Sequence, residues 1–261
     1  MKAYLSIILG AVVLFSCNSP QEKTIQQVLS PEDQIAANAD QHYNSFKETK
    51  SYPFSFGGDS QYEVSRYDSD SFPTYMQVRI NAGDYGHEES QFYLDRNNQL
   101  LLITQNGLRR GPELPRGGEF YERKVYITAD TIRVAKEKTA SHKEDLQNAK
   151  WETWKPKSLT EGQFRPIWML KHNYYDAVAA QGNFDWHFEQ IQKISDDISL
   201  IVLNGKEHVQ SSFFVHPSKA TGLLKELIDK PEDFKGQKIE VQLVKEELNG
   251  DIVNFAKSAK K

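Results

Sequence analysis

The sequence contains a single cysteine, Cys17, and therefore no second thiol with which to form a disulfide. A fold stabilised by internal disulfides is excluded, although an exported protein would be permitted one. Basic residues are not in excess either, because 32 Lys and Arg stand against 36 Asp and Glu, for a formal net charge of −4. Nucleic-acid binding requires a surface of clustered positive charge, so this composition argues against a nucleic-acid partner.

Motifs of common catalytic and metal sites are also missing. The sequence has no G-x-S-x-G nucleophile motif and no H-x-H or H-E-x-x-H spacing. Its seven histidines are scattered, at His42, His87, His142, His172, His187, His208 and His216. The sequence therefore predicts no metal site, no cofactor and no catalytic residue that a motif identifies.

One apolar run stands out, and it lies at the N-terminus. Lys2 is followed by an almost uninterrupted apolar segment over residues 3–15. A positive residue followed by an apolar segment is typical of a secretory signal peptide. The run is shorter than the roughly 20 apolar residues that a membrane-spanning helix needs. We therefore expect residues 1–16 to be a signal peptide that is removed on export.

The end of this run resembles the lipobox of bacterial lipoproteins, Leu14-Phe15-Ser16-Cys17, with Phe15 where a small residue is usual. The resemblance implies lipidation of Cys17 and cleavage before it, which would explain the lone thiol. Residues 17–29 are polar and would form a tether to the membrane. Asn18 follows the cysteine in place of the aspartate that retains enteric lipoproteins at the inner membrane, and this favours the outer membrane.

Residues 30–136 are expected to form a helix followed by an antiparallel β-meander. Ser30-Pro31-Glu32-Asp33 has the cap residue, the first-turn proline and the acids of a helix start, and the apolar spacing continues to about Thr49. From Tyr62 the apolar period changes to two, which predicts strands. The segments are 62–67, 74–81, 89–94, 99–105, 120–127 and 130–136.

Two further segments complete the chain. Residues 137–174 are charged and predict a connector, in which a capping box at Ser141 starts a short helix ending near Trp154. Residues 175–261 predict three strands, a helix and one or two more strands, with Asn204-Gly205 as a hairpin turn. This order resembles that of an OB-fold. The expected fold class is α+β, mostly antiparallel β, with a smaller barrel-like C-terminal half.

The loop around residues 106–118 carries the strongest candidate binding residues, Arg109, Arg110 and Arg116. Three guanidinium groups on one loop could bind a carboxylate or phosphate of an acidic ligand or of an envelope protein. The alternative is a solvated hairpin loop whose arginines pair with nearby acids, and the sequence favours this alternative.

Other clusters have a structural explanation as well as a functional one. His87-Glu88-Glu89 could contribute metal ligands, but neighbouring strand residues face opposite ways. Asp185, His187 and Glu189 could transfer protons, or could form the wet face of a strand. Trp151 and Trp154, together with Lys150, Lys155 and Lys157, could rest on a membrane or pack on the sheet.

Three functions stay open. The first, which the sequence favours, is a non-enzymatic envelope lipoprotein that binds a partner or ligand through its sheet surfaces. The second is a glycan-active hydrolase, which would need two carboxylates in a cleft. The third is an OB-like module that binds an oligosaccharide or peptide through Trp186, Phe213 and Phe214, provided that these rings are exposed.

Overall fold

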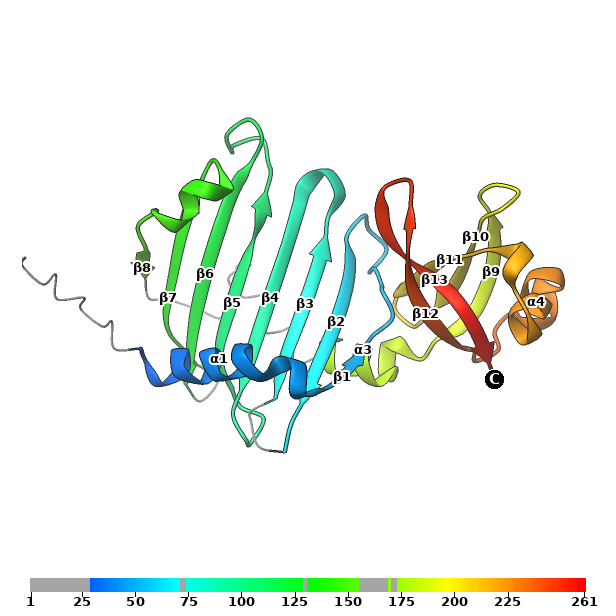
Figure 1. Ribbon diagram of the computed structural model, residues 1–261, viewed down its shortest axis with the longest axis horizontal. Coiled ribbons are helices and arrows are strands. Elements are labelled where there is room, and N and C mark those ends of the chain that lie inside the picture. The colour runs from blue at the N-terminus through cyan, green and yellow to red at the C-terminus, as the bar shows by residue number, and fades with distance from the viewer. Residues whose placement is uncertain (1–28, 71–73, 129–130, 155–168, 170–172) are drawn as a thin grey trace, which may run out of the picture.

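The structure is a computed structural model that describes residues 29–70, 74–128, 131–154, 169 and 173–261. It confirms the α+β class with mostly antiparallel strands: an eight-stranded sheet lies beside a five-stranded one (Figure 1). Cys17, with the predicted signal peptide and most of the tether, lies outside the described residues. In the part of the chain that the structure describes, no helix combines the length and apolar character needed to cross a bilayer.

The larger sheet is a simple meander in which each strand pairs with the next along the chain. All six predicted strands are present, several of them longer than expected, and two short strands are added at the edges. The strands are β1 (Lys47–Lys50), β2 (Gln61–Asp68), β3 (Tyr75–Asn81), β4 (Gly86–Leu94), β5 (Leu100–Arg109), β6 (Glu119–Thr128), β7 (Thr131–Ala140) and β8 (Glu152–Trp154).

Helix α1 (Pro31–His42) begins as predicted and ends earlier. The Ser30 side chain accepts a hydrogen bond from the Asp33 amide, which confirms the cap. The expected continuation to Thr49 is wrong: a 3₁₀ turn, η1 (Tyr43–Ser45), follows, and the backbone is extended from Phe46. Pairing of β1 with β2 provides this segment with backbone hydrogen bonds that a longer helix would have supplied.

The helix predicted from Ser141 to Trp154 is also wrong. A 3₁₀ helix, η3 (Lys143–Gln147), has no side-chain cap, and Glu152–Trp154 is strand β8, paired with β7. This segment therefore extends the meander sheet. The rest of the predicted connector, residues 155–168 and 170–172, lies outside the described residues.

The C-terminal half has the strand order predicted from the sequence. Strands β9 (His187–Lys193), β10 (Ser199–Asn204) and β11 (Gln210–Val215) form a meander, helix α4 (Gly222–Asp229) follows, and β12 (Glu240–Leu248) pairs with β13 (Asp251–Lys260). Strand β13 runs parallel to β11, and a bridge between His187 and Lys238 joins β9 to the segment before β12. The five strands thus close in the order of an OB-fold.

The remaining short elements are 3₁₀ or α-helical. They are η2 (Gly83–Tyr85), α3 (Tyr175–Ala179), η6 (Gly182–Phe184), η7 (Pro217–Lys219) and η8 (Pro231–Phe234). The predicted Asn204-Gly205 hairpin exists, but its loop is longer than a two-residue turn, because the Gly205 amide donates to the Val209 carbonyl.

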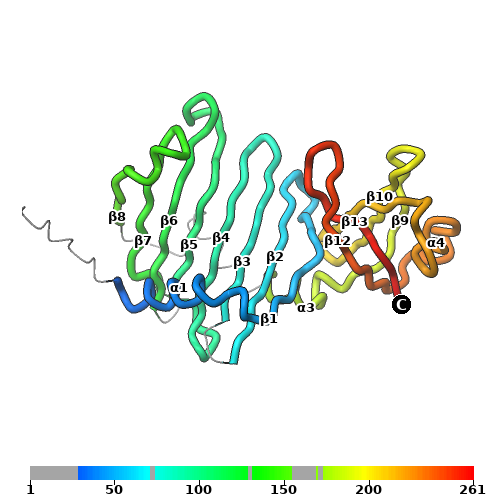
Figure 2. Tube along the Cα trace, viewed as in Figure 1, coloured from blue at the N-terminus to red at the C-terminus, as the bar shows by residue number. Residues whose placement is uncertain are grey.

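The meander sheet has two buried sides. On the front face, crossed by α1 in Figures 1 and 2, a small cluster joins Ala36 and Ala39 of the helix to tyrosines of the strands. The back face carries the main core, which continues without a break into the barrel. The segment before β2 connects the two sheets: Phe54 pairs with Tyr62, and Ser55 pairs with Gln210 of β11. Meander and barrel are therefore packed against one another.

Candidate ligand-binding cleft

The front face of the meander is organised in rows that cross the strands, because the strands pair in register. The row that packs against helix α1 contains Tyr67, Tyr75, Tyr93, Leu102 and Tyr126 on β2 to β6. These residues are buried, and the first three rings are 5.2 and 5.3 Å apart between neighbouring centroids. Helix α1 covers this row, so the tyrosines are part of the core and not an open surface.

A charged row lies four residues further along each strand, on the same face. It joins Glu63, Arg79, Glu89, Asn106, Glu122 and Lys138 on β2 to β7. Arg79 Nε is 3.1 Å from Glu89 Oε2, and Lys138 Nζ is 2.8 Å from Glu122 Oε2. At the barrel end, Lys245 Nζ is 3.1 Å from Glu63 Oε1. Helix α1 does not cover this row.

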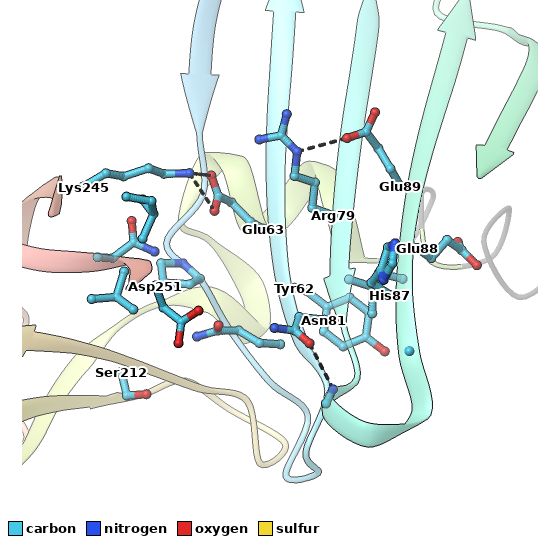
Figure 3. Close-up of a pocket in the computed structure, with 18 of the residues that line it drawn as sticks. Tyr62, Glu63, Arg79, Asn81, His87, Glu88, Glu89, Ser212, Lys245 and Asp251 are labelled. Carbon is cyan, nitrogen blue, oxygen red and sulfur yellow. Dashed lines mark hydrogen bonds and ion pairs between the residues drawn. The ribbon is translucent and has the colours of Figure 1, made fainter. Parts of the chain in front are cut away.

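A cleft of about 840 Å³ opens where this face meets the barrel (Figure 3). On the meander side it is lined by Glu63, Arg79, Asn81 and Glu89, and on the barrel side by Ser212, Lys245 and the start of β13. Figure 3 shows Lys245 reaching Glu63 across one end, with Asp251 and Ser212 facing β2 and β3 from the barrel. The cleft is therefore built by both halves of the chain.

Proline explains why the two halves separate at this point. The amide and carbonyl of Ser55 both bond to Gln210, so extending this antiparallel register would place Pro53 opposite Ser212. Proline has no N–H to donate, and the ladder cannot continue. On the same edge, pairing of β11 with β13 among the described residues is limited to Phe214 and Phe255. The edge of β11 at Ser212 consequently borders the cleft.

Part of the polar lining of the cleft is held in place by ion pairs and hydrogen bonds within the chain. Glu63 and Glu89 each have a cation within 3.1 Å, and the Asn81 side chain accepts a hydrogen bond from the Gly83 amide. Groups fixed by such pairing are suited to hold a ligand by hydrogen bonds.

The three candidate arginines do not converge on one site. Arg109 lies on the back face, where it binds Glu119 at 2.6 Å and Glu137 at 3.1 Å. Arg110 lines the cleft, and its Nε donates to the Gly117 carbonyl. Arg116 is exposed on the loop. The prediction of a shared anion site is therefore replaced by three separate positions, and for Arg109 the alternative of pairing with nearby acids is confirmed.

A partly buried polar network surrounds Arg109 on the back face. The Tyr121 hydroxyl donates to Glu88 at 2.6 Å, and the guanidinium carbons of Arg109 and Arg123 lie 5.2 and 5.6 Å from the centre of its ring. Arg123 Nε in turn donates to Glu137 at 2.8 Å. These groups satisfy one another, so the network fixes the register of β4 to β7 and offers no open ligand position.

The other predicted clusters separate in a similar way. His87 and Glu89 face the front, whereas Glu88 faces the back, and within the described ranges no three His, Cys, Asp or Glu side chains are grouped to hold a metal ion. Asp185 pairs with Lys238 at 2.7 Å and Glu189 with Lys235 at 3.0 Å, as expected of a wet strand face.

The aromatic residues proposed for an OB-like binding face are mostly core residues. Trp186 and Phe213 are 3% and 1% exposed, which rules them out as stacking platforms. Phe214 is half-buried and lines the cleft, while its ring packs 5.7 Å from that of Phe255. Trp151, by contrast, is 40% exposed, with Lys138 Nζ 5.2 Å from its ring centre.

The residues that form the cleft were not identified from the sequence. Glu63, Arg79 and Lys245 read as ordinary solvated positions on alternating strands, and only the strand register brings them together. Comparison of the chain with protein-family models, curated proteins and solved structures gave no match. What the cleft does must therefore be argued from its geometry and chemistry.

Proposed function

We propose that this chain is a lipid-anchored protein of the bacterial envelope that binds a ligand, without catalysis, in the cleft between meander and barrel. The lipobox-like sequence ending at Cys17 supports the anchor, and Asn18 after it favours the outer membrane. The observation that carries the binding role is the cleft of about 840 Å³, in which two ion pairs, Arg79 with Glu89 and Lys245 with Glu63, are in place before any ligand arrives. Such preorganisation reduces the entropy cost of binding.

The anchor is tested by intact-mass measurement of protein purified from membranes. The expected N-terminus is Cys17 with acyl groups attached, and Cys17→Ala should stay unprocessed or leave the membrane. An unmodified N-terminus at any other residue would show that the chain is not a lipoprotein.

The cleft is tested by thermal unfolding with a panel of envelope components. A ligand at a hundred times its Kd stabilises the folded state by about 2.7 kcal/mol, which raises Tm by about 5–10 °C for a chain of this size. Ser212→Trp should fill the cleft and abolish the shift. Ser195→Trp, on the exposed β9–β10 loop, is the matched control and should keep it. A shift that survives Ser212→Trp would place the ligand elsewhere.

A further inference from the structure

The cleft does not end at β4. A second cavity, of about 750 Å³, lies over β4 to β6 on the same front face and is bounded by η3 and Trp151. Both cavities are lined by His87 and Asn106. They therefore form one groove that crosses the strands above α1, from the β12–β13 hairpin at one end to Trp151 at the other.

The charged row from Glu63 to Glu122 forms the floor of this groove, and each of its charges is paired with one of opposite sign. Lys245 with Glu63, Arg79 with Glu89, and Lys138 with Glu122 are three ion pairs at 2.8 to 3.1 Å. Other charged side chains along the groove also occur with both signs, as Arg110 with Asp251 and Lys143 with Glu144. A ligand of one charge would meet as much repulsion as attraction, so the floor favours an uncharged ligand.

Asn106 lies near the centre of the row and is its one uncharged side chain. Its neighbours across the strands are Glu89 and Glu122, both already paired with cations. The Asn106 side chain is exposed and, among the described residues, has no hydrogen-bond partner. An amide both donates and accepts, which is what recognition of a hydroxyl group requires.

The spacing of the row distinguishes between two elongated uncharged ligands, an oligosaccharide and an extended peptide. Side chains of the row recur at the interstrand distance, about 4.8 Å, so the floor from β2 to β6 is about 19 Å long. An extended chain of β-1,4-linked hexoses advances by slightly more than this interstrand distance per sugar. An extended peptide repeats its side chains on one face at about 6.6–6.8 Å and would fall out of step with the row.

We propose that the groove binds an uncharged oligosaccharide of about four sugars, laid across strands β2 to β6. This proposal rests on the binding function proposed above and names the class of ligand. Asn106 and the paired acids and arginine of the row bond to hydroxyl groups. Trp151 offers its exposed ring to the apolar face of a terminal sugar. Lys138 Nζ lies 5.2 Å from the centre of the same ring.

The experiment is binding of the lipidated protein, in detergent, to two arrays. One carries neutral hexose and N-acetylhexosamine chains of one to six sugars together with polyuronates, and the other carries unstructured decapeptides. Binding to neutral chains that strengthens from two to four sugars is expected. Binding to no glycan, to polyuronates alone, or to peptides in place of glycans overturns the proposal.

Variants at the two ends of the groove then locate the ligand. Asn106→Ala and Trp151→Ala should each weaken binding of the best neutral tetrasaccharide at least ten-fold. Their matched controls, Asn97→Ala and Tyr85→Ala, replace an exposed amide and an exposed aromatic ring that line neither cavity, and should bind normally. Unchanged binding by both Asn106→Ala and Trp151→Ala, with each variant shown to be folded by circular dichroism, overturns the proposal.

Comparing Ser212→Trp with Trp151→Ala also distinguishes a failure of this proposal from a failure of the proposed function. If Ser212→Trp abolishes binding of some ligand but Trp151→Ala does not affect it, the cleft is a binding site and the extension across the sheet is wrong. If neither substitution affects the ligand, the ligand binds elsewhere and the function proposed for the cleft fails.

Discussion

Two aspartates of helix α1 contact the sheet, and their replacement by asparagine should have opposite effects. Asp33 Oδ1 is 2.7 Å from Lys124 Nζ, and the Tyr126 hydroxyl donates to the same carboxylate at 3.0 Å. Asp40 accepts a hydrogen bond from the Tyr93 hydroxyl at 2.8 Å. Only Ala36 and Ala39 of the helix are buried, so these polar contacts, together with the 2.7 Å ion pair between Glu32 and Arg133, contribute much of what holds the helix.

Burial alone would raise the pKa of Asp33, but hydrogen bonds from Lys124, Ser30 and Tyr126 outweigh it and lower this pKa below its ordinary value of 3.8. The folded state therefore favours the carboxylate, and this stabilisation is present above the ordinary pKa and lost as pH falls through the folded value. Asp33→Asn should cost about 1–2 kcal/mol at pH 7, from a partly exposed ion pair and a first-turn acid.

Asp40 behaves in the opposite way. Burial raises its pKa, and the Tyr93 hydrogen bond offsets this only in part. Its protonated form is favoured by folding, so the wild type loses stability as pH rises through the folded pKa. Asparagine keeps an acceptor for Tyr93 and removes the charge that partial burial disfavours. Asp40→Asn should therefore be as stable as the wild type at pH 7 or more stable, by up to about 1 kcal/mol.

The assay is urea unfolding followed by circular dichroism at pH 7 and pH 2.5, with exposed Asp59→Asn as the control. The deficit of Asp33→Asn should shrink at the lower pH, because the carboxylate takes up a proton, and its stabilisation is lost, as pH falls through the folded pKa. An equal deficit at both pH values, or a loss for Asp40→Asn as large as that for Asp33→Asn, would refute this account of how α1 is held.

Three further substitutions test the back face, the strand pairing and the loop. Tyr121→Phe removes the 2.6 Å hydrogen bond to Glu88 and should lower the free energy of unfolding by about 1.5–3 kcal/mol in the same urea assay. Gly107→Ala would place a Cβ 2.2 Å from the His87 carbonyl oxygen, so it should force β4 and β5 apart and cost about 1–3 kcal/mol, seen as a lower Tm. Arg116→Ala, at an exposed position, should change stability by less than about 0.5 kcal/mol; a larger loss would show a contact that the loop geometry does not explain.

The parts of the fold that the sequence predicts are those with a local signal. Alternating apolar residues predict β2 to β7, and the Ser30 cap predicts the start of α1. Strand β1 escapes prediction because Lys47–Lys50 is exposed along its whole length and has no alternation. Strand β8 is only three residues long and is defined by its pairing with β7. Where tertiary pairing determines the structure, local patterns carry no information.

The candidate site was less predictable for a related reason. The three arginines near one loop predict a shared binding site there. Arg109 instead points to the back face, because strand residues alternate between faces. Glu63 and Lys245, which close the cleft, are far apart in the sequence and meet only when the barrel docks on the meander. Their types are those of any solvated strand, so nothing in the sequence distinguishes them before the register is known.

The geometry of the front face explains why the groove is open where it is. Helix α1 has 12 residues and is therefore about 18 Å long, which matches the four interstrand steps, about 19 Å, from Tyr67 on β2 to Tyr126 on β6. The helix thus covers the tyrosine row from end to end, and the strands continue beyond it with polar rows. Because those polar rows satisfy much of their own charge, they need no further cover from the chain. The same division that buries the aromatic row leaves a preorganised polar floor facing solvent beside it.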